Sequence, residues 1–171
     1  MNNITYNYQS HLIQLQAEAE NEFLKAFKEG DYTFAHPMVK ENPYQIAPLT
    51  ALIMFRLSEP AAVHICVKGK NDAGNMDFDV PAAQEQYISV YGLYPDYKNE
   101  VVLTLEDGTS STVHIQTDAA PDCIHQPDYV KTTSEYFGQQ VMFVTPSSAS
   151  KVAAFDYTGD LRWYISVDVV L

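Results

Sequence analysis

The sequence is poor in cysteine and in basic residues, and it has no long hydrophobic run. Its two cysteines, Cys66 and Cys123, are too few for a disulfide framework and do not decide the redox compartment. Ten Lys and Arg against 22 Asp and Glu give a formal charge of −12. This charge argues against nucleic acid and anionic lipid as partners. Because no stretch of about 18 apolar residues is present, no membrane span is predicted.

The first ten residues, MNNITYNYQS, have neither the basic nor the apolar region of a signal peptide. Either the protein is cytoplasmic, or a leader that preceded this sequence has been removed. Hydrophobic residues make up 46% of the 171 residues and aromatic residues 12%, which is typical of a folded globular protein. Twelve Tyr and eight Phe favour β-structure over a helical bundle.

Residues 10–29 carry the one clear helical pattern, and we assign residues 1–30 to an N-terminal helix. Apolar side chains recur every three or four residues along one face, and Gly30 follows where a helix-ending glycine belongs. This stripe could pack on the body of the protein or on a second copy, and we expect packing within one chain. Its members are Leu12, Leu15, Ala19, Phe23, Ala26 and Phe27.

Residues 31–120 have the pattern of a β-sandwich. Strands are predicted in PLTALIMFRL (residues 48–57), ended by the turn SEP, and then in AAVHICVKGK (residues 61–70) and EQYISVYGL (residues 85–93). Residues 100–117 predict a hairpin that turns at Asp107 and Gly108. Short strands separated by turn signals at this spacing are typical of a sandwich. The buried face of the hairpin is predicted to hold Val101, Leu103, Leu105, Val113 and Ile115.

Residues 121–138 show no sustained period and are predicted to be a linker, followed by a second set of strands in residues 139–171. In the last strand, Leu161, Trp163 and Ile165 alternate with polar residues, which predicts one buried face. A strand of this kind needs neighbours on both edges. We therefore expect this ribbon to pair with a second copy, to fold onto the sandwich or to fray.

Four ordered motifs carry a family resemblance: residues 42–53 (NPYQIAPLTALI), 67–70 (VKGK), 92–108 (GLYPDYKNEVVLTLEDG) and 155–165 (FDYTGDLRWYI). Together they resemble the bacterial arylsulfate sulfotransferases, at the amino-terminal β-sandwich and its junction with the catalytic domain. The resemblance implies an immunoglobulin-like sandwich followed by a six-bladed β-propeller. It also implies that residues 139–171 are the first strands of that propeller, so that the chain is a fragment.

The resemblance further implies an extracytoplasmic enzyme whose propeller histidine moves sulfate from a phenolic sulfate ester to a phenol, without an adenylyl-sulfate donor. None of the five histidines here lies in a stretch that matches the catalytic motif. We therefore predict no catalytic residue in this chain and no cofactor, and we expect it to be inactive alone. The five are His11, His36, His64, His114 and His125. Tyr164 is the candidate substrate-binding residue, because aromatic walls suit aryl substrates.

The triplets HIC (residues 64–66) and CIH (residues 123–125) leave three alternatives open. They could form a Cys₂His₂ zinc site, a disulfide between Cys66 and Cys123, or unpaired thiols. The zinc signal is weak because the usual C-x₂-C turn is absent, and we predict no metal. The acidic loop with Asp72, Asp77 and Asp79 lacks the order of a calcium loop and is predicted to be solvated.

The sequence leaves three alternative functions. The first is a non-catalytic amino-terminal domain that braces the propeller of an arylsulfate sulfotransferase, with a possible homodimer. The second is a free-standing immunoglobulin-like binding or dimerisation module at a cell surface. The third, a complete small enzyme, is the weakest because no acid–base or nucleophile set converges.

Overall fold

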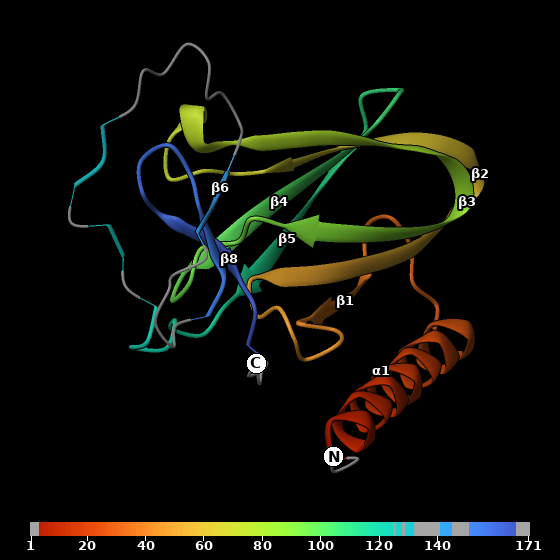
Figure 1. The fold of residues 1–171 in the computed structure, drawn as a ribbon. Helices are drawn as coiled ribbons and strands as arrows, with labels where there is room; N and C mark the ends of the chain where they lie inside the picture. Colours follow the sequence, from red (N-terminus) through yellow and green to blue (C-terminus); the bar gives the residue numbers. More distant parts are fainter. Residues whose placement is uncertain (1–3, 125, 128, 132–140, 145–150, 167–171) are drawn as a thin grey trace.

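The computed structural model describes residues 4–124, 126–127, 129–131, 141–144 and 151–166. Within them lie one α-helix, one short 3₁₀ helix and eight strands, and the predicted mainly β fold with one N-terminal helix is confirmed (Figure 1). The elements are α1 (Ile4–Glu29), β1 (Met38–Glu41), β2 (Thr50–Val67), η1 (Asp72–Gly74), β3 (Met76–Tyr91), β4 (Lys98–Leu105), β5 (Ser110–Gln116), β6 (Met142–Val144), β7 (Ala153–Phe155) and β8 (Leu161–Tyr164).

The centre of the fold is a long hairpin, β2 and β3, that curves over on itself (Figure 1). β3 follows one edge of β2 along both of its halves. On the other edge, β1 pairs with the first half of β2, and β4 pairs with the second half and in turn with β5. One curled sheet of five strands therefore supplies both layers of the sandwich.

The curve in β2 corrects the predicted turn at residues 58–60. These residues lie inside one continuous strand, and the register with β3 shifts between Arg56 and Ala61 and again between Ala61 and Val63. Pro60 cannot donate a ladder hydrogen bond, and two alanines follow it, so pairing is loosened without reversing the chain. Residues 58–62 are compatible with a turn or with a bend. The segment is a bend because β2 pairs with β3 both before and after it.

Gln86 holds this bend from the inside. Its side chain is 4% exposed, and its Nε2 lies within hydrogen-bond distance of the carbonyl oxygens of Ala61 (2.9 Å), Pro81 (3.1 Å) and Ala83 (3.4 Å). These carbonyls lie near the two register shifts of the ladder. The buried amide thus adds side-chain hydrogen bonds where the strand pairing is irregular.

Gln86→Leu is expected to lower the free energy of unfolding by about 1–3 kcal/mol, because it removes a buried donor from part-buried carbonyl groups at the bend. Chemical denaturation monitored by circular dichroism measures the change. Gln84→Leu is the matched control: Gln84 is exposed on the same strand and makes one long bond to the Ser58 carbonyl (3.3 Å). Equal losses for the two variants would contradict the role given to Gln86.

The main core lies between the two halves of the curled sheet. Ile53 and Phe55 from the first half of β2 and Ile65 and Val67 from its second half belong to one buried cluster. The predicted β4–β5 hairpin is confirmed, with Gly108 at φ +85° in the turn. Of its predicted inward side chains, Leu105 is only half-buried, and the other four are buried: Val101, Leu103, Val113 and Ile115.

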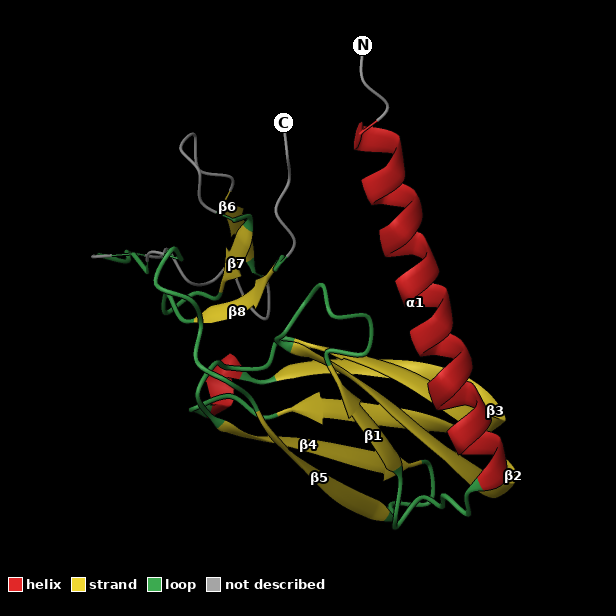
Figure 2. Ribbon diagram, turned by 90° about the horizontal axis from the view of Figure 1, so that it is seen from below, coloured by secondary structure: helices red, strands yellow, loops and turns green. Residues whose placement is uncertain are grey.

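The outward face of the first half of β2 is covered by the end of α1 (Figure 2). Phe23 and Phe27 pack there, in a second cluster with Met38, Leu52 and Met54. The helix leaves the sheet toward its N-terminus. The predicted helix packing within one chain is thus confirmed for the last turns alone; Leu15, in the same stripe, is 47% exposed.

Arg56 at the bend of β2 joins this helix to the sheet. It donates to the carbonyls of Phe27 (3.0 Å) and Gly30 (2.9 Å) at the end of α1 and forms an ion pair with Glu85 on β3 (2.9 Å). Its guanidinium lies 4.3 Å from the centre of the Phe27 ring. Carbonyls at a helix end lack intrahelical partners, and Arg56 supplies them. Gly30 does not take the left-handed conformation of a helix-ending glycine; a Cβ there would meet the Tyr32 ring at 2.2 Å.

Candidate functional site

The small sheet β6–β7–β8 packs against one end of the sandwich (Figure 2). Ala153, Phe155, Leu161 and Tyr164 belong to the same buried cluster as the sandwich core. Of the three expected behaviours of this ribbon, folding onto the sandwich is the one observed. Residues 132–140, at the end of the predicted linker and the start of the predicted second domain, and residues 167–171 lie outside the described part of the chain.

The burial of β8 differs from the predicted alternation. Arg162, predicted on the polar face, is 0% exposed, whereas Trp163, predicted on the buried face, is only half-buried. The reason is an irregularity in the ladder: Ala154 pairs with Trp163, but Phe155 pairs with Leu161, which leaves Arg162 as an extra residue. Such a bulge re-aims a side chain. Here it turns a guanidinium into the interface with the sandwich.

Arg162 binds three separate parts of the chain. Its Nε donates to the Gly92 carbonyl after β3 (2.7 Å), and its Nη1 donates to the Gly74 carbonyl in η1 (3.1 Å). Nη1 also lies 2.9 Å from the Tyr94 hydroxyl and 2.8 Å from Oδ2 of Asp156, and the guanidinium stacks on the Tyr94 ring at 4.0 Å. These contacts connect the small sheet to the sandwich through one buried cation.

Asp156 is the counterion, and its own loop holds it in place. Its Oδ1 accepts from the Thr158 amide (3.0 Å), the Thr158 hydroxyl (2.7 Å) and the Asp160 amide (3.1 Å). Gly159 permits the turn with φ +87°. Burial raises the pKa of the Asp156 carboxyl, but the hydrogen bonds from Thr158 and Arg162 outweigh it, and the pKa lies below its ordinary value.

Asp156→Asn is expected to destabilise the protein at neutral pH and to lose this effect in acid. Because the folded pKa is lowered from 3.8, the stability that the carboxylate contributes is fully present above about pH 4. It disappears as the pH falls through the lowered pKa. Unfolding measured for both proteins from neutral pH to about pH 2 should show the gap closing in the acid range. A difference in stability between the two proteins that stays constant with pH would contradict the lowered pKa of Asp156.

The sandwich side of the junction is held by Asn99. This 0% exposed amide donates to the carbonyls of Tyr94 (3.0 Å) and Tyr97 (3.0 Å), and its Oδ1 accepts from the Tyr94 amide (2.7 Å). Tyr94 therefore presents its ring and hydroxyl to Arg162 from a rigid turn. The sequence motif around residues 92–108 pointed to this turn but not to the arginine that it receives.

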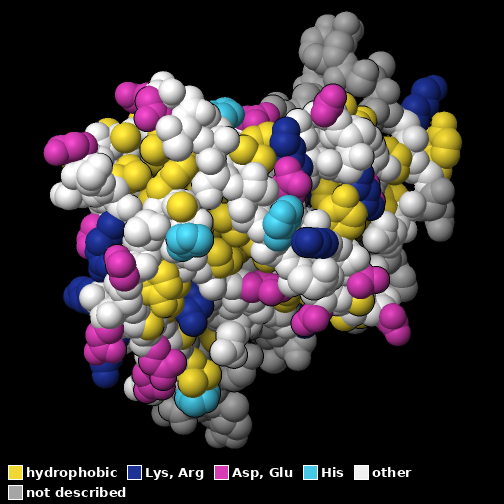
Figure 3. Space-filling model, turned by 180° about the vertical axis from the view of Figure 1, so that it is seen from behind, with side chains coloured by type: hydrophobic (Ala, Val, Ile, Leu, Met, Phe, Trp, Pro, Cys, Tyr) yellow, Lys and Arg dark blue, Asp and Glu magenta, His cyan; other side chains and the backbone are white. Residues whose placement is uncertain are grey.

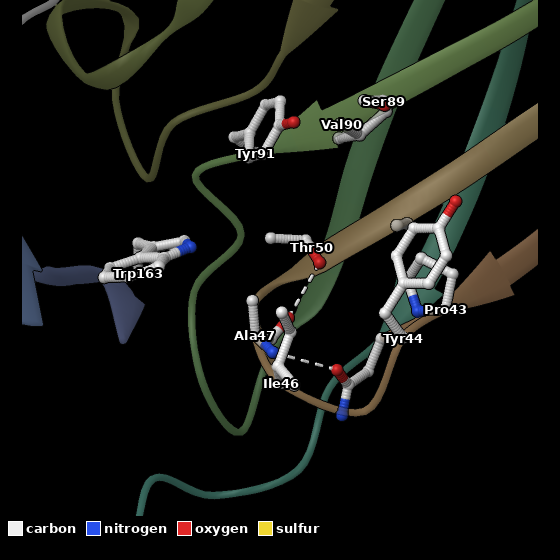
Figure 4. A pocket seen from close by; sticks show the side chains of 11 residues that line it. Pro43, Tyr44, Ile46, Ala47, Thr50, Ser89, Val90, Tyr91 and Trp163 are labelled. Carbon is white, nitrogen blue, oxygen red and sulfur yellow. Dashed lines mark hydrogen bonds between the residues drawn. The ribbon is translucent and has the colours of Figure 1, made fainter. Parts of the chain in front are cut away.

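Two adjoining cavities lie where the sandwich meets the small sheet. The first, of about 240 Å³, lies between the start of β2, the end of β3 and Trp163 (Figure 4). There the Thr50 hydroxyl donates to the Ala47 carbonyl (2.7 Å), and the Ala47 amide donates to Asn42 (3.1 Å). The second, of about 330 Å³, shares Tyr91 and Trp163 with the first.

The predicted substrate-binding residue, Tyr164, lies in the main core at 5% exposure and not in either cavity wall. Burial, followed by Asp118 and Cys123, raises the pKa of its hydroxyl. Its role in substrate binding stays a prediction. The residues that do meet at the junction are Arg162, predicted to lie on the polar face, and Trp163.

The cysteines and histidines do not converge. Cys66 is buried and Cys123 exposed, and both are free thiols; burial, followed by Asp77, raises the pKa of Cys66 to about 11. His64 lies on an outer sheet face between Asp79 (2.8 Å) and Asp77 (3.5 Å). His125 of the proposed zinc set is not among the described residues. Within those that are, no group of three or more His, Cys, Asp or Glu could hold a metal ion. His11, His36 and His114 are exposed. The predicted acidic loop is wrong for two of its aspartates: Asp77 and Asp79 lie in β3, paired with Cys66 and His64, and only Asp72 lies outside the strand, in η1. All three carboxylates are on exposed residues.

The comparison with known families bears on the sandwich. The family model for the arylsulfotransferase Ig-like domain matches residues 38–120, from β1 to just beyond β5. Residues 38–120 form an arylsulfotransferase Ig-like domain. The resemblance stated from the sequence is thereby confirmed for this domain, and three of its four motifs lie in the matched range. The fourth, residues 155–165, forms the Arg162 junction outside it. No curated protein matches the chain.

The surface around the Ig-like domain carries mixed charges. On the face shown in Figure 3, acidic side chains are scattered, and Lys and Arg side chains lie between them. Among the described helices none has the length and apolar character needed to cross a membrane.

Proposed function

We propose that this Ig-like domain is a non-catalytic, amino-terminal part of an arylsulfate sulfotransferase and that it braces the start of the catalytic domain. In this proposal residues 139–171 are the first strands of a propeller, reached through a linker at residues 121–138. The observation that carries the proposal is the buried Arg162, which ties β8 to Gly74, Gly92 and Tyr94 of the Ig-like domain. A domain boundary fastened by a buried ion pair acts as a fixed support rather than a hinge.

The chemistry of the described residues agrees with a supporting role. A sulfuryl-transfer site needs a nucleophile with cationic donors beside it. His64 is bound between two carboxylates on an exposed face, and the buried cation Arg162 is paired with Asp156. Sulfate transfer from a phenolic sulfate ester to a phenol would then belong to the propeller of the whole enzyme, in an extracytoplasmic compartment.

The test compares this 171-residue chain with the natural gene product, using p-nitrophenyl sulfate as donor and phenol as acceptor. We expect release of p-nitrophenol by the gene product and none above the buffer control by the 171-residue chain. Turnover by the chain alone would contradict the non-catalytic assignment. A folded gene product that includes a propeller and still transfers no sulfate would contradict the enzyme assignment.

The second candidate, a free-standing Ig-like binding or dimerisation module, is favoured by the exposed apolar side chains of α1. Ile13 is 65% exposed and Leu15 47%. Sedimentation equilibrium of the protein and of Leu15→Glu tests this function. A dimer that becomes a monomer in the variant would favour it, and a monomer in both would exclude dimerisation through this helix.

A further inference from the structure

The larger cavity at the junction has one polar feature and otherwise apolar walls. Its volume of about 330 Å³ falls within the range of small-molecule sites. It lies between the sandwich and the small sheet, so that both contribute walls. The lining residues are Met76, Tyr91, Gly92, Val141, Phe143, Arg162 and Trp163.

The polar feature is the free edge of the Arg162 guanidinium. Nε and Nη1 are used by Gly92, Gly74, Tyr94 and Asp156, but the buried Nη2 has no hydrogen-bond partner among the described residues. Buried donors in proteins are nearly always paired, because an unpaired one forfeits its hydration. Nη2 is therefore available to an acceptor that the described residues do not supply.

The absence of a side chain at Gly92 lets the Met76 thioether pack close to Nη2 of Arg162. A Cβ on Gly92 would stand 2.4 Å from the Met76 sulfur and 3.6 Å from Nη2 of Arg162. All three residues line the cavity. A side chain at position 92 would displace the Met76 thioether beside the guanidinium.

The remaining walls of the cavity favour a ligand with an aromatic ring. Phe143 and Trp163 meet edge to face, with ring centres 5.7 Å apart at 65°, and Tyr91 also lines the cavity. Arg162 is the only charged side chain in the lining, and its ion pair with Asp156 uses Nη1 alone. A positively charged ligand would face the guanidinium, whereas a carboxylate would pair with it.

We propose that this cavity binds a small aromatic carboxylate, whose ring lies against Trp163 and Phe143 and whose oxygen accepts a hydrogen bond from Nη2 of Arg162. This goes beyond the proposed supporting function, because it concerns the binding of a ligand and needs no sulfate transfer. Binding would also give Nη2 of Arg162 a hydrogen-bond partner.

Trp163 is the only tryptophan of the chain, so its fluorescence reports on the cavity directly. The full 171-residue chain is titrated at neutral pH with 4-nitrobenzoate, whose nitroaromatic ring quenches indole emission. The comparison probes are 4-nitrobenzylamine, which is a cation, and 4-nitrotoluene, which is neutral. We expect saturable quenching by the acid, with at least tenfold weaker binding of the other two. Unsaturable quenching, or equal affinities for all three, would overturn the proposal.

Two variants on β6 locate the binding. Phe143→Ala removes an aromatic wall, and we expect it to weaken 4-nitrobenzoate binding at least fivefold. Met142→Ala is the matched control, because Met142 is its neighbour, is 50% exposed and does not line the cavity. Equal affinities of the two variants for 4-nitrobenzoate would contradict binding in this cavity. Arg162→Met, which removes the positive charge, should abolish the preference for the acid over the amine. Should this variant not fold, the three probes and the β6 pair still decide the outcome.

Discussion

Arg162→Met is expected to lower the free energy of unfolding by about 3–5 kcal/mol, the largest effect of any single polar substitution considered in this chain. The variant leaves the Asp156 carboxylate buried at 3% side-chain exposure without its cation. It also removes the donors to the carbonyls of Gly74 and Gly92. Urea denaturation monitored by circular dichroism, together with Trp163 fluorescence for the junction, measures the loss.

The double variant Arg162→Met/Asp156→Leu separates the ion pair from general disruption. Removing both partners of a buried pair costs less than removing one, so the double variant should be more stable than Arg162→Met alone. Lys25→Met is the surface control, because Lys25 and Glu29 are both well exposed and 3.9 Å apart. Its effect should stay within about 0.5 kcal/mol. Strictly additive losses in the double variant would show that the two residues do not act together.

Phe27→Ala is expected to cost about 3–5 kcal/mol and to release the end of α1 from the sheet. Phe27 is 0% exposed, stacks on Tyr32 with ring centres 5.9 Å apart and meets the edge of Tyr87 at 5.3 Å. Its removal leaves a cavity and takes away the ring under Arg56. Denaturation gives the size of the loss, and limited proteolysis with mass spectrometry shows whether cleavage moves into α1.

Leu15→Ala is the control for the helix. Leu15 lies on the same helix and is 47% exposed, so the substitution keeps helix propensity and removes little buried surface. We expect a change below about 0.5 kcal/mol and no new cleavage. Comparable losses in the two helix variants would mean that α1 packs along its whole length.

The β4–β5 hairpin was predictable because the residues that determine it are close together in the sequence. Asp107 and Gly108 give the turn, and the alternation of Val101, Leu103, Val113 and Ile115 gives the buried face. The curve of β2 was not predictable in this way, because Pro60 is compatible both with a chain-reversing turn and with a bend inside a strand. The choice depends on β3, whose Gln86 donates to the Ala61 carbonyl at the bend from 25 residues away.

The sequence predicted which segment forms the junction with the sandwich, but not which residues make the contacts there. The motif at residues 155–165 pointed to this segment, yet the alternation of Leu161 and Trp163 put Arg162 on a polar face. The bulge that turns Arg162 inward has no local signal, and its acceptors at Gly92 and Gly74 lie 70 and 88 residues away. The available hint was an arginine within an apolar strand, directly after an aspartate-rich turn that could supply its counterion.

Native-state hydrogen exchange tests most directly whether Arg162 makes the small sheet and the Ig-like domain one cooperative unit. The amides of β7 and β8 are compared with those of β2 and β4. The amide of Ile165, directly after β8, is included with the first set because it donates to the Val152 carbonyl (3.1 Å). We predict that both sets open with the same free energy, and that Arg162→Met lowers this value first for β7 and β8. Rapid exchange of β7 and β8 in the unaltered protein, while β2 and β4 stay protected, would contradict the account.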